Sequence, residues 1–240
     1  MKIYNLFFLV VLFSTSSCGF YNGKNINDCS ECSSNNAYYN RYVEIASKEN
    51  LSNERLPRPE LGLNDDIKRE LNYFLKQDRK FILNSLNNKR KFEPMILKVF
   101  DDHGVPGELA TVALIESKYE PNAVSRSGAA GMWQFMKATG EDYGLSINYS
   151  NDERHDPVLS TIAAAKHLKD LYVKYNDWFL ALAAYNAGIG TVNKTMNKAN
   201  SSDFWEIKKL FREQTQRYVA RFVAVNIILQ DLDYWGFKME

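Results

Sequence analysis

Apolar residues recur at three- and four-residue steps along most of the chain after residue 63, and this helical periodicity constrains the fold more than any other feature. We find no sustained two-residue alternation of the kind that predicts strands. The sequence therefore predicts an all-α protein, with one short hairpin allowed near residues 125–131. The first apolar stripe runs through Ile67, Leu71, Phe74, Leu75, Ile82 and Leu86.

Capping residues and prolines predict the helix boundaries. Asn64 or Asp65 would cap the first helix. The same signals predict five more helices. They are a second helix from Pro94 to Gly104, a third that begins at Pro106, a long helix that begins at Asp156-Pro157, another from Asp177 to Gly188, and a last one from about Glu213 to Leu232. No internal repeat interrupts this order.

The N-terminus has the three parts of a secretory signal. Lys2 precedes an apolar run, and the small residues 14–17 lead to Cys18. The run is shorter than the roughly 20 apolar residues that a membrane-spanning helix needs. Small residues before a cysteine resemble a bacterial lipobox, which implies that Cys18 carries a lipid; Thr15 stands where that motif usually has Leu. The alternative is an ordinary cleaved signal without lipid.

Composition divides the remaining chain into segments, and the net charge argues against one class of function. Residues 19–60 are polar and contain prolines near their end, so we interpret them as a tether that can hold some local order. Residues 61–104 are then a helical lead and 105–235 a catalytic domain. The net charge of +1 does not suit a nucleic-acid binder.

Two further cysteines and three histidines give little indication of metal or redox chemistry. Cys29 and Cys32 form a C-x-x-C pair in a polar stretch without a second ligand pair, so a local disulfide or two idle thiols are favoured over a redox or metal site. The histidines lack metal-ligand spacing. We therefore expect neither a metal nor a cofactor.

Glu116 is the first candidate for chemistry. Leu109, Val112 and Glu116 share one face of a predicted helix, so a carboxyl lies on an apolar stripe. Burial disfavours the charged form and raises the pKa of such a carboxyl, as a general acid at neutral pH requires. The alternatives are a buried Glu with a structural partner, or one turned into solvent at the helix end.

Two more clusters follow Glu116. The small residues 125–131 would let a ligand approach the backbone, and they lead into Met132-Trp133-Gln134-Phe135, where an amide lies between aromatic rings. Tyr185-Asn186 then precedes Gly188 at a predicted helix end. Taken singly, these could be a linker, core aromatics and a helix stop.

Together and in this order, Glu116-Ser117, Gly128-x-x-Gly131-Met132-Trp133-Gln134 and Ala184-Tyr185-Asn186-Ala187-Gly188 resemble the soluble lytic transglycosylases, nearest the membrane-bound murein transglycosylase D type. The resemblance covers roughly residues 105–232. It implies a lysozyme-like helical fold and an enzyme that cuts the glycan strands of peptidoglycan. No C-terminal LysM repeats follow, so binding is expected from the groove and the anchor.

The resemblance also implies roles for individual residues. Glu116 would be the single acid and base that cleaves the MurNAc–GlcNAc bond and leaves 1,6-anhydro-MurNAc ends. The saccharide groove would be lined by Ser125, Met132, Gln134, Tyr185, Asn186 and Tyr218. Gln214 stands where the family has a glutamate, with Glu213 one position away, so a carboxylate role there is in question.

Two other functions stay open on the sequence alone. One is a hydrolytic, goose-type lysozyme-like muramidase in which a loop acid serves as base. The other is a non-catalytic glycan-binding envelope protein, which would not need a protonated acid. For the favoured function we expect a lipid-anchored protein facing the periplasm, with Gly19 after Cys18 indicating the outer membrane.

Overall fold

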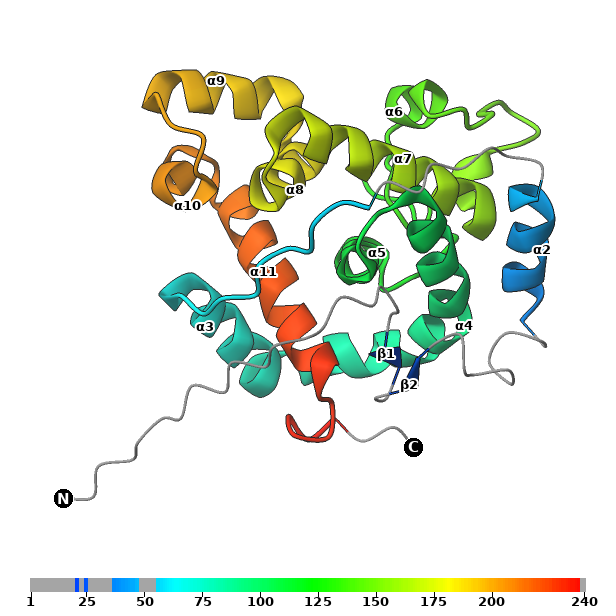
Figure 1. Cartoon of the computed structure of the whole chain (residues 1–240), viewed down its shortest axis with the longest axis horizontal. Helices are drawn as coiled ribbons and strands as arrows, with labels where there is room; N and C mark the ends of the chain where they lie inside the picture. The colour runs from blue at the N-terminus through cyan, green and yellow to red at the C-terminus, as the bar shows by residue number, and fades with distance from the viewer. Residues whose placement is uncertain (1–19, 22–23, 26–35, 48–54, 238–240) are drawn as a thin grey trace.

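The computed structural model describes residues 20–21, 24–25, 36–47 and 55–237, and these are mostly helical (Figure 1). Cys18, Cys29 and Cys32 lie outside the described residues. A pair of two-residue strands, β1 (Phe20–Tyr21) and β2 (Lys24–Asn25), is antiparallel. No helix within the described ranges is long and apolar enough to cross a membrane.

The helices are α2 (Ala37–Ala46), α3 (Asp65–Asn72), α4 (Arg79–His103), α5 (Thr111–Ser117), α6 (Lys137–Asp142), α7 (Pro157–Tyr175), α8 (Trp178–Ala187), α9 (Ile189–Ala199), α10 (Phe204–Ile207) and α11 (Glu213–Gln230). A π-helical turn, Tyr73–Gln77, joins α3 to α4, and 3-10 turns at Gly107–Ala110, Glu153–His155 and Lys208–Leu210 precede α5, α7 and α11.

Helix α5 lies at the centre of the bundle. Figure 1 shows it nearly end-on, surrounded by α4, α7, α8 and α11. Its residues Thr111 to Leu114 are at most 3% exposed, and Thr111 donates a hydrogen bond to the Asn226 side chain of α11 at 3.0 Å. Because α5 is buried on most of its surface, the residues at its end are held by the whole core.

Side-chain caps formed where the sequence predicted them. Asn64 caps α3, Asp156 caps α7 and Asp177 caps α8, each by accepting backbone N–H bonds from the first turn. Gly104 ends α4 with a φ of 73°, as the predicted stop requires.

The prediction that Pro94 opens a new helix is wrong. Helix α4 runs through Pro94 without a break between Arg79 and His103. A proline inside a helix loses one backbone hydrogen bond. Here the apolar face continues on both sides of it, with Phe92, Met95 and Ile96 at most 1% exposed, and this burial outweighs the lost bond.

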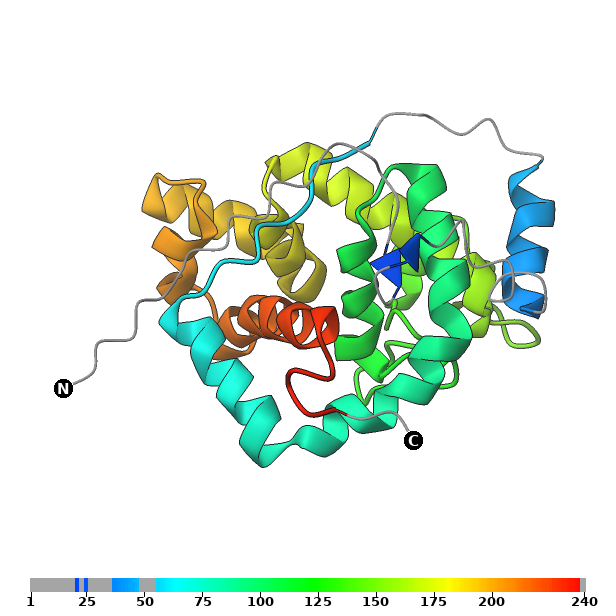
Figure 2. The ribbon, with the colours of Figure 1, turned by 60° about the horizontal axis from the view of Figure 1, so that its bottom comes forward.

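Part of the predicted tether is an ordered helix. Helix α2 packs on α4 and α7, and its Tyr42 is 1% exposed. Arg41 pairs with Asp156 at 2.6 Å, which connects α2 to the cap of α7. The domain boundaries predicted from sequence stay predictions, but residues 36–47 rest on the helical bundle (Figure 2).

The helical lead is joined to α11 by a buried carboxylate that pairs with two partly exposed arginines. Glu70 of α3 is 2% exposed, and it accepts hydrogen bonds from Arg217 at 2.7 Å and Arg221 at 2.9 Å. A buried carboxylate that loses its partners costs about 3–5 kcal/mol, so this pairing specifies how α3 docks.

Candidate active site

Glu116 lies in the last turn of α5, directly before a sharp reversal of the chain. Lys118 and Tyr119 both have left-handed backbones, with φ of 57° and 58°. The N–H groups of these two residues close the helix on Leu114 and Ala113 at 2.8 and 3.1 Å. Tyr119 is fully buried, so this turn is packed as well as hydrogen-bonded. The position of Glu116 is therefore specified from both sides.

Burial controls the protonation of Glu116. The side chain is half-buried, and desolvation raises the pKa of its carboxyl from the ordinary 4.5 to about 7. The Tyr218 hydroxyl opposes this shift by stabilising the charged form. No charged side chain is among the causes of the shift. The carboxyl can thus both hold and release a proton near neutral pH.

Tyrosines from two other helices face this carboxyl. Tyr218 of α11 is 6% exposed. Its hydroxyl has no partner of standard hydrogen-bond geometry among the described residues, and Glu116 is the group it approaches. The Tyr185 hydroxyl of α8 donates to the Trp133 carbonyl at 2.7 Å. Burial, and then the charge of Glu116, raises the pKa of both tyrosines, so both stay protonated donors.

The small-residue stretch forms a tight bridged loop beside α5. Ala130 pairs with both Val124 and Phe135, which places a short hairpin where the sequence allowed one. Ser117 donates to the Met132 carbonyl at 2.8 Å and so joins the loop to α5. Ser125 is half-buried, and its hydroxyl accepts the Ala129 N–H at 2.9 Å.

The amide side chains expected in the groove use only part of their hydrogen-bonding capacity within the protein. Gln134, with a φ of 50°, donates its amide nitrogen to the carbonyls of Gly131 and Ala123 at 2.9 and 3.2 Å. Asn186 accepts a hydrogen bond from Thr215 at 3.0 Å, which joins α8 to α11. Gln134 therefore keeps its side-chain oxygen as an acceptor, and Asn186 keeps its N–H groups as donors.

The Met132 side chain is buried in the structure, whereas the sequence predicted that it lines the groove. Its side chain is 0% exposed and lies in the core, because the loop turns it inward between Gly131 and Trp133. Only its backbone carbonyl reaches the site, as the acceptor for Ser117. Trp133 and Phe135 are core residues too, at 0% and 2% exposed, and the Trp133 indole donates to Thr161 at 3.0 Å.

Arg154 supports the loop and was not identified from the sequence. It is 9% exposed, pairs with Asp152 at 2.7 Å, and donates to the carbonyls of Gly128 and Phe135 at 2.9 and 3.0 Å. Its own carbonyl approaches Gly131 so closely that a Cβ there would lie 1.8 Å away. The residues around Arg154 are polar and predict an exposed loop, so the sequence did not indicate that Arg154 supports residues 125–135.

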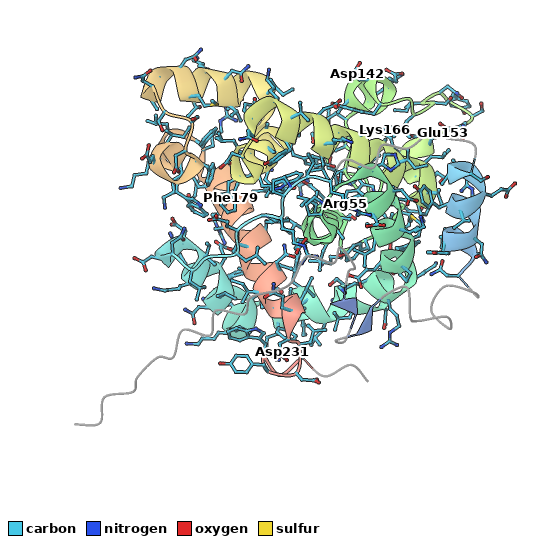
Figure 3. All side chains as sticks on the ribbon, in the orientation of Figure 1. Arg55, Asp142, Glu153, Lys166, Phe179 and Asp231 are labelled. Atoms are coloured by element: carbon cyan, nitrogen blue, oxygen red, sulfur yellow. The ribbon has the colours of Figure 1, made fainter. Side chains whose placement is uncertain are left out.

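The other acids around the domain have structural partners. Asp152 pairs with Arg154, Glu120 accepts the Asn122 N–H at 3.1 Å, and Glu141 pairs with Lys137 at 3.8 Å. Asp142 and Glu153 lie apart from α5 in the view of Figure 3. Among the described acids, burial raises the pKa of Glu116 to about 7; burial also raises the pKa of Asp177, but that carboxyl caps α8.

Two surface hollows among the described residues lie away from the site. One hollow lies between α3 and the start of α11 and is lined by Glu70, Tyr73 and Arg217 among others. A second lies between α2 and the start of α7. Neither is lined by Glu116, so we assign the candidate site from its electrostatics and hydrogen bonds.

The raised pKa of Glu116 predicts a pH-dependent stability. Between about pH 4.5 and 7 the folded protein holds this proton and the unfolded chain does not. The free energy of unfolding should therefore fall across this range by about 2–3 kcal/mol from this group. Glu116→Gln removes the ionisation, so its stability relative to the wild type should rise by that amount between pH 4.5 and 8. Urea unfolding of both proteins measures it, and a pH-independent difference would contradict the assignment.

Comparison with known proteins finds a family model that matches part of the chain. Residues 101–208 match the family model of the transglycosylase SLT domain. This part of the chain is similar to an SLT domain. This match runs from the end of α4 to the turn after α10, so it includes Glu116, the bridged loop and Tyr185-Asn186 and ends before Tyr218.

The relatives that the chain matches are considerably longer proteins. The chain is 37% identical over 140 residues to membrane-bound lytic murein transglycosylase D of Escherichia coli K12, which covers 56% of the chain and 30% of that protein. It is 36% identical over 138 residues to the peptidoglycan transglycosylase gp16 of phage T7, covering 56% of the chain and 10% of that protein. The chain thus spans less than a third of the length of these two relatives.

A solved structure confirms the fold class. The 70 kDa soluble lytic transglycosylase of Escherichia coli superposes with a TM-score of 0.50 and 16% sequence identity, covering 85% of this chain and 42% of that one. The predicted all-α, lysozyme-like fold is therefore correct.

Proposed function

We propose that this protein is a lytic transglycosylase that cuts the glycan strands of peptidoglycan. The observation that carries the proposal is the Glu116 carboxyl, kept protonated near neutral pH by burial within an SLT domain. The names of the relatives, a murein transglycosylase and a peptidoglycan transglycosylase, support the same substrate.

In the proposed reaction Glu116 acts twice. Its carboxyl first protonates the oxygen between N-acetylmuramic acid and N-acetylglucosamine, and the bond to the muramyl carbon breaks with an oxocarbenium-like transition state. The resulting carboxylate then takes the proton of the muramyl C6 hydroxyl. That oxygen bonds to the muramyl carbon and closes a 1,6-anhydro ring. The C6 proton replaces the one that Glu116 gave to the leaving sugar, so the carboxyl ends the cycle protonated and no water is consumed.

The neighbouring side chains fit this sequence. Tyr218 stabilises the carboxylate that exists between the two steps, because its hydroxyl favours the charged form of Glu116. The Gln134 oxygen and the Asn186 N–H groups offer an acceptor and donors to sugar hydroxyls, and we expect Ser125 and Tyr185 to line the same groove. The C6 hydroxyl needs no second protein carboxylate, since it is tethered to the reacting sugar at high effective concentration.

The products distinguish this reaction from hydrolysis. Mass spectrometry of muropeptides released by the purified protein should find 1,6-anhydro-muramyl ends, which are one water lighter than reducing ends. The assay run in H₂¹⁸O should leave these ends unlabelled. Reducing ends that carry ¹⁸O would identify a hydrolytic muramidase and contradict the single-carboxylate mechanism.

We also propose that Cys18 anchors the protein to the outer membrane, facing the periplasm. The support is the lipobox-like N-terminal pattern and the membrane-bound relatives. Cys18→Ser should abolish incorporation of labelled fatty acid and move the protein out of the membrane fraction, with Cys29→Ser as the matched control. Equal labelling of Cys18→Ser and the wild type would refute a lipid on this cysteine.

A further inference from the structure

A column of aromatic rings lies behind Tyr185, with a histidine at its centre. The His167 ring of α7 stacks on Tyr185 with centroids 5.1 Å apart and 28° between planes, and on Tyr143 at 4.7 Å and 26°. Phe135 lies 6.0 Å from the same imidazole. The neighbouring Lys166 is labelled in Figure 3 and shows where this turn of α7 runs below α6.

The far end of the column is fixed as well. Tyr143, which follows α6, donates its hydroxyl to Asp170 of α7 at 3.1 Å. His167 is therefore held between a hydrogen-bonded tyrosine on one side and the active-site tyrosine on the other. The chain of contacts runs from Asp170 to Tyr185 and ends beside Glu116.

Hydrogen bonding does not explain the buried Nδ1 atom of His167. Its Nδ1 is buried and has no partner among the described residues. Burial also lowers the pKa of the imidazole to about 4, so it is uncharged throughout the pH range in which Glu116 changes protonation. The His167 ring therefore presents a flat, uncharged surface to the Tyr185 ring.

Tyr185 needs such a surface because one hydrogen bond holds only the tip of its side chain, and a sideways movement of the ring would carry the hydroxyl with it. The hydroxyl donates to the Trp133 carbonyl. Stacking of the ring on His167, with Phe135 tilted at 54° on the same ring, restricts that movement. We propose that His167 is a positioning residue that holds the Tyr185 hydroxyl beside Glu116; this inference rests on the proposed function.

The test compares a planar with a non-planar replacement. His167→Phe keeps the stack and should retain at least about half of kcat on soluble glycan strands. His167→Leu loses the stack and should lower kcat about tenfold with KM changed less than about twofold, because misplacing a catalytic contact affects the transition state more than binding. Val173→Ala, at a 68% exposed position of the same helix, is the matched control and should match the wild type.

A double-mutant cycle tests whether His167 acts through Tyr185. In a Tyr185→Phe background, His167→Leu should cause little further loss of kcat, because the hydroxyl it positions is gone. Multiplicative losses, or a loss in His167→Phe as large as in His167→Leu, would overturn the proposal. If His167→Leu does not fold, His167→Met takes its place with the same expectations, since a flexible thioether fills the gap without a planar face.

An activity-independent measurement separates this inference from the proposed function. In protein labelled with 3-fluorotyrosine, the Tyr185 ¹⁹F signal is assigned by its loss in Tyr185→Phe. It should be similar in the wild type and His167→Phe and be shifted or broadened in His167→Leu. An unchanged signal in His167→Leu refutes the positioning role, whereas intact signals with no muralytic activity in the wild type refute only the enzyme.

Discussion

Glu116→Gln should lower the release of muropeptides from purified peptidoglycan by about 10³-fold or more while the protein stays folded. Glu116 transfers a proton in both proposed steps, and one placed proton transfer contributes about 10²- to 10⁴-fold. The fold should persist because the neutral amide replaces a carboxyl that burial already keeps protonated near neutral pH. Initial rates, with circular dichroism as the folding check, give the measurement.

The matched control is Glu120→Gln, four residues further along the chain. Glu120 is exposed, and its carboxylate accepts only the local Asn122 N–H among the described residues, so this variant should keep wild-type activity within about twofold, as expected for a residue outside the reaction. Retention of more than about a tenth of the activity by Glu116→Gln would exclude it as general acid. An equal loss in Glu120→Gln would favour a two-carboxylate reaction.

Gly131→Ala should destabilise the protein by about 4 kcal/mol and remove its activity. The φ of this glycine is +80°, which costs an L-residue about 1–2 kcal/mol, and the new Cβ would lie 1.8 Å from the Arg154 carbonyl oxygen. Relief of this overlap has to move either the bridged loop or the backbone before α7. Urea unfolding at fixed pH and a muralytic assay measure the two effects.

Gly128→Ala separates steric overlap from backbone strain. Gly128 has nearly the same backbone conformation, with a φ of +84°, but nothing lies within 4 Å of its added Cβ. We expect a loss of about 1 kcal/mol and retained activity. Equal losses for the two alanine variants would mean that the contact with Arg154 does not hold the loop.

Local signals explain which parts of the fold could be predicted. The caps at Asn64, Asp156 and Asp177 depend on a side chain and the N–H groups two or three residues further on, so the sequence contains all the information. The prediction of a helix break at Pro94 was wrong because it depends on contacts with distant segments and not on local sequence. Whether a helix tolerates a proline depends on how much apolar surface it buries against distant segments, and only the packed structure supplies that.

The candidate site divides in the same way. Glu116 could be identified because its spacing from Leu109 and Val112 predicts that all three residues share one face of a helix. Arg154 could not, since the carbonyls it binds belong to residues 19 and 26 positions earlier in the chain. The inward turn of Met132 depends on the loop's backbone geometry, with Gly131 at a φ of 80°, which residue types alone do not specify.

The shared carboxylate of Glu70 has a consequence for how this protein can be shortened. A version that begins at residue 105, where the family resemblance begins, would lack the buried carboxylate that pairs with Arg217 and Arg221, on the same helix that presents Tyr218 to Glu116. Such a version should be less stable than one that starts before Asn64 and keeps α3.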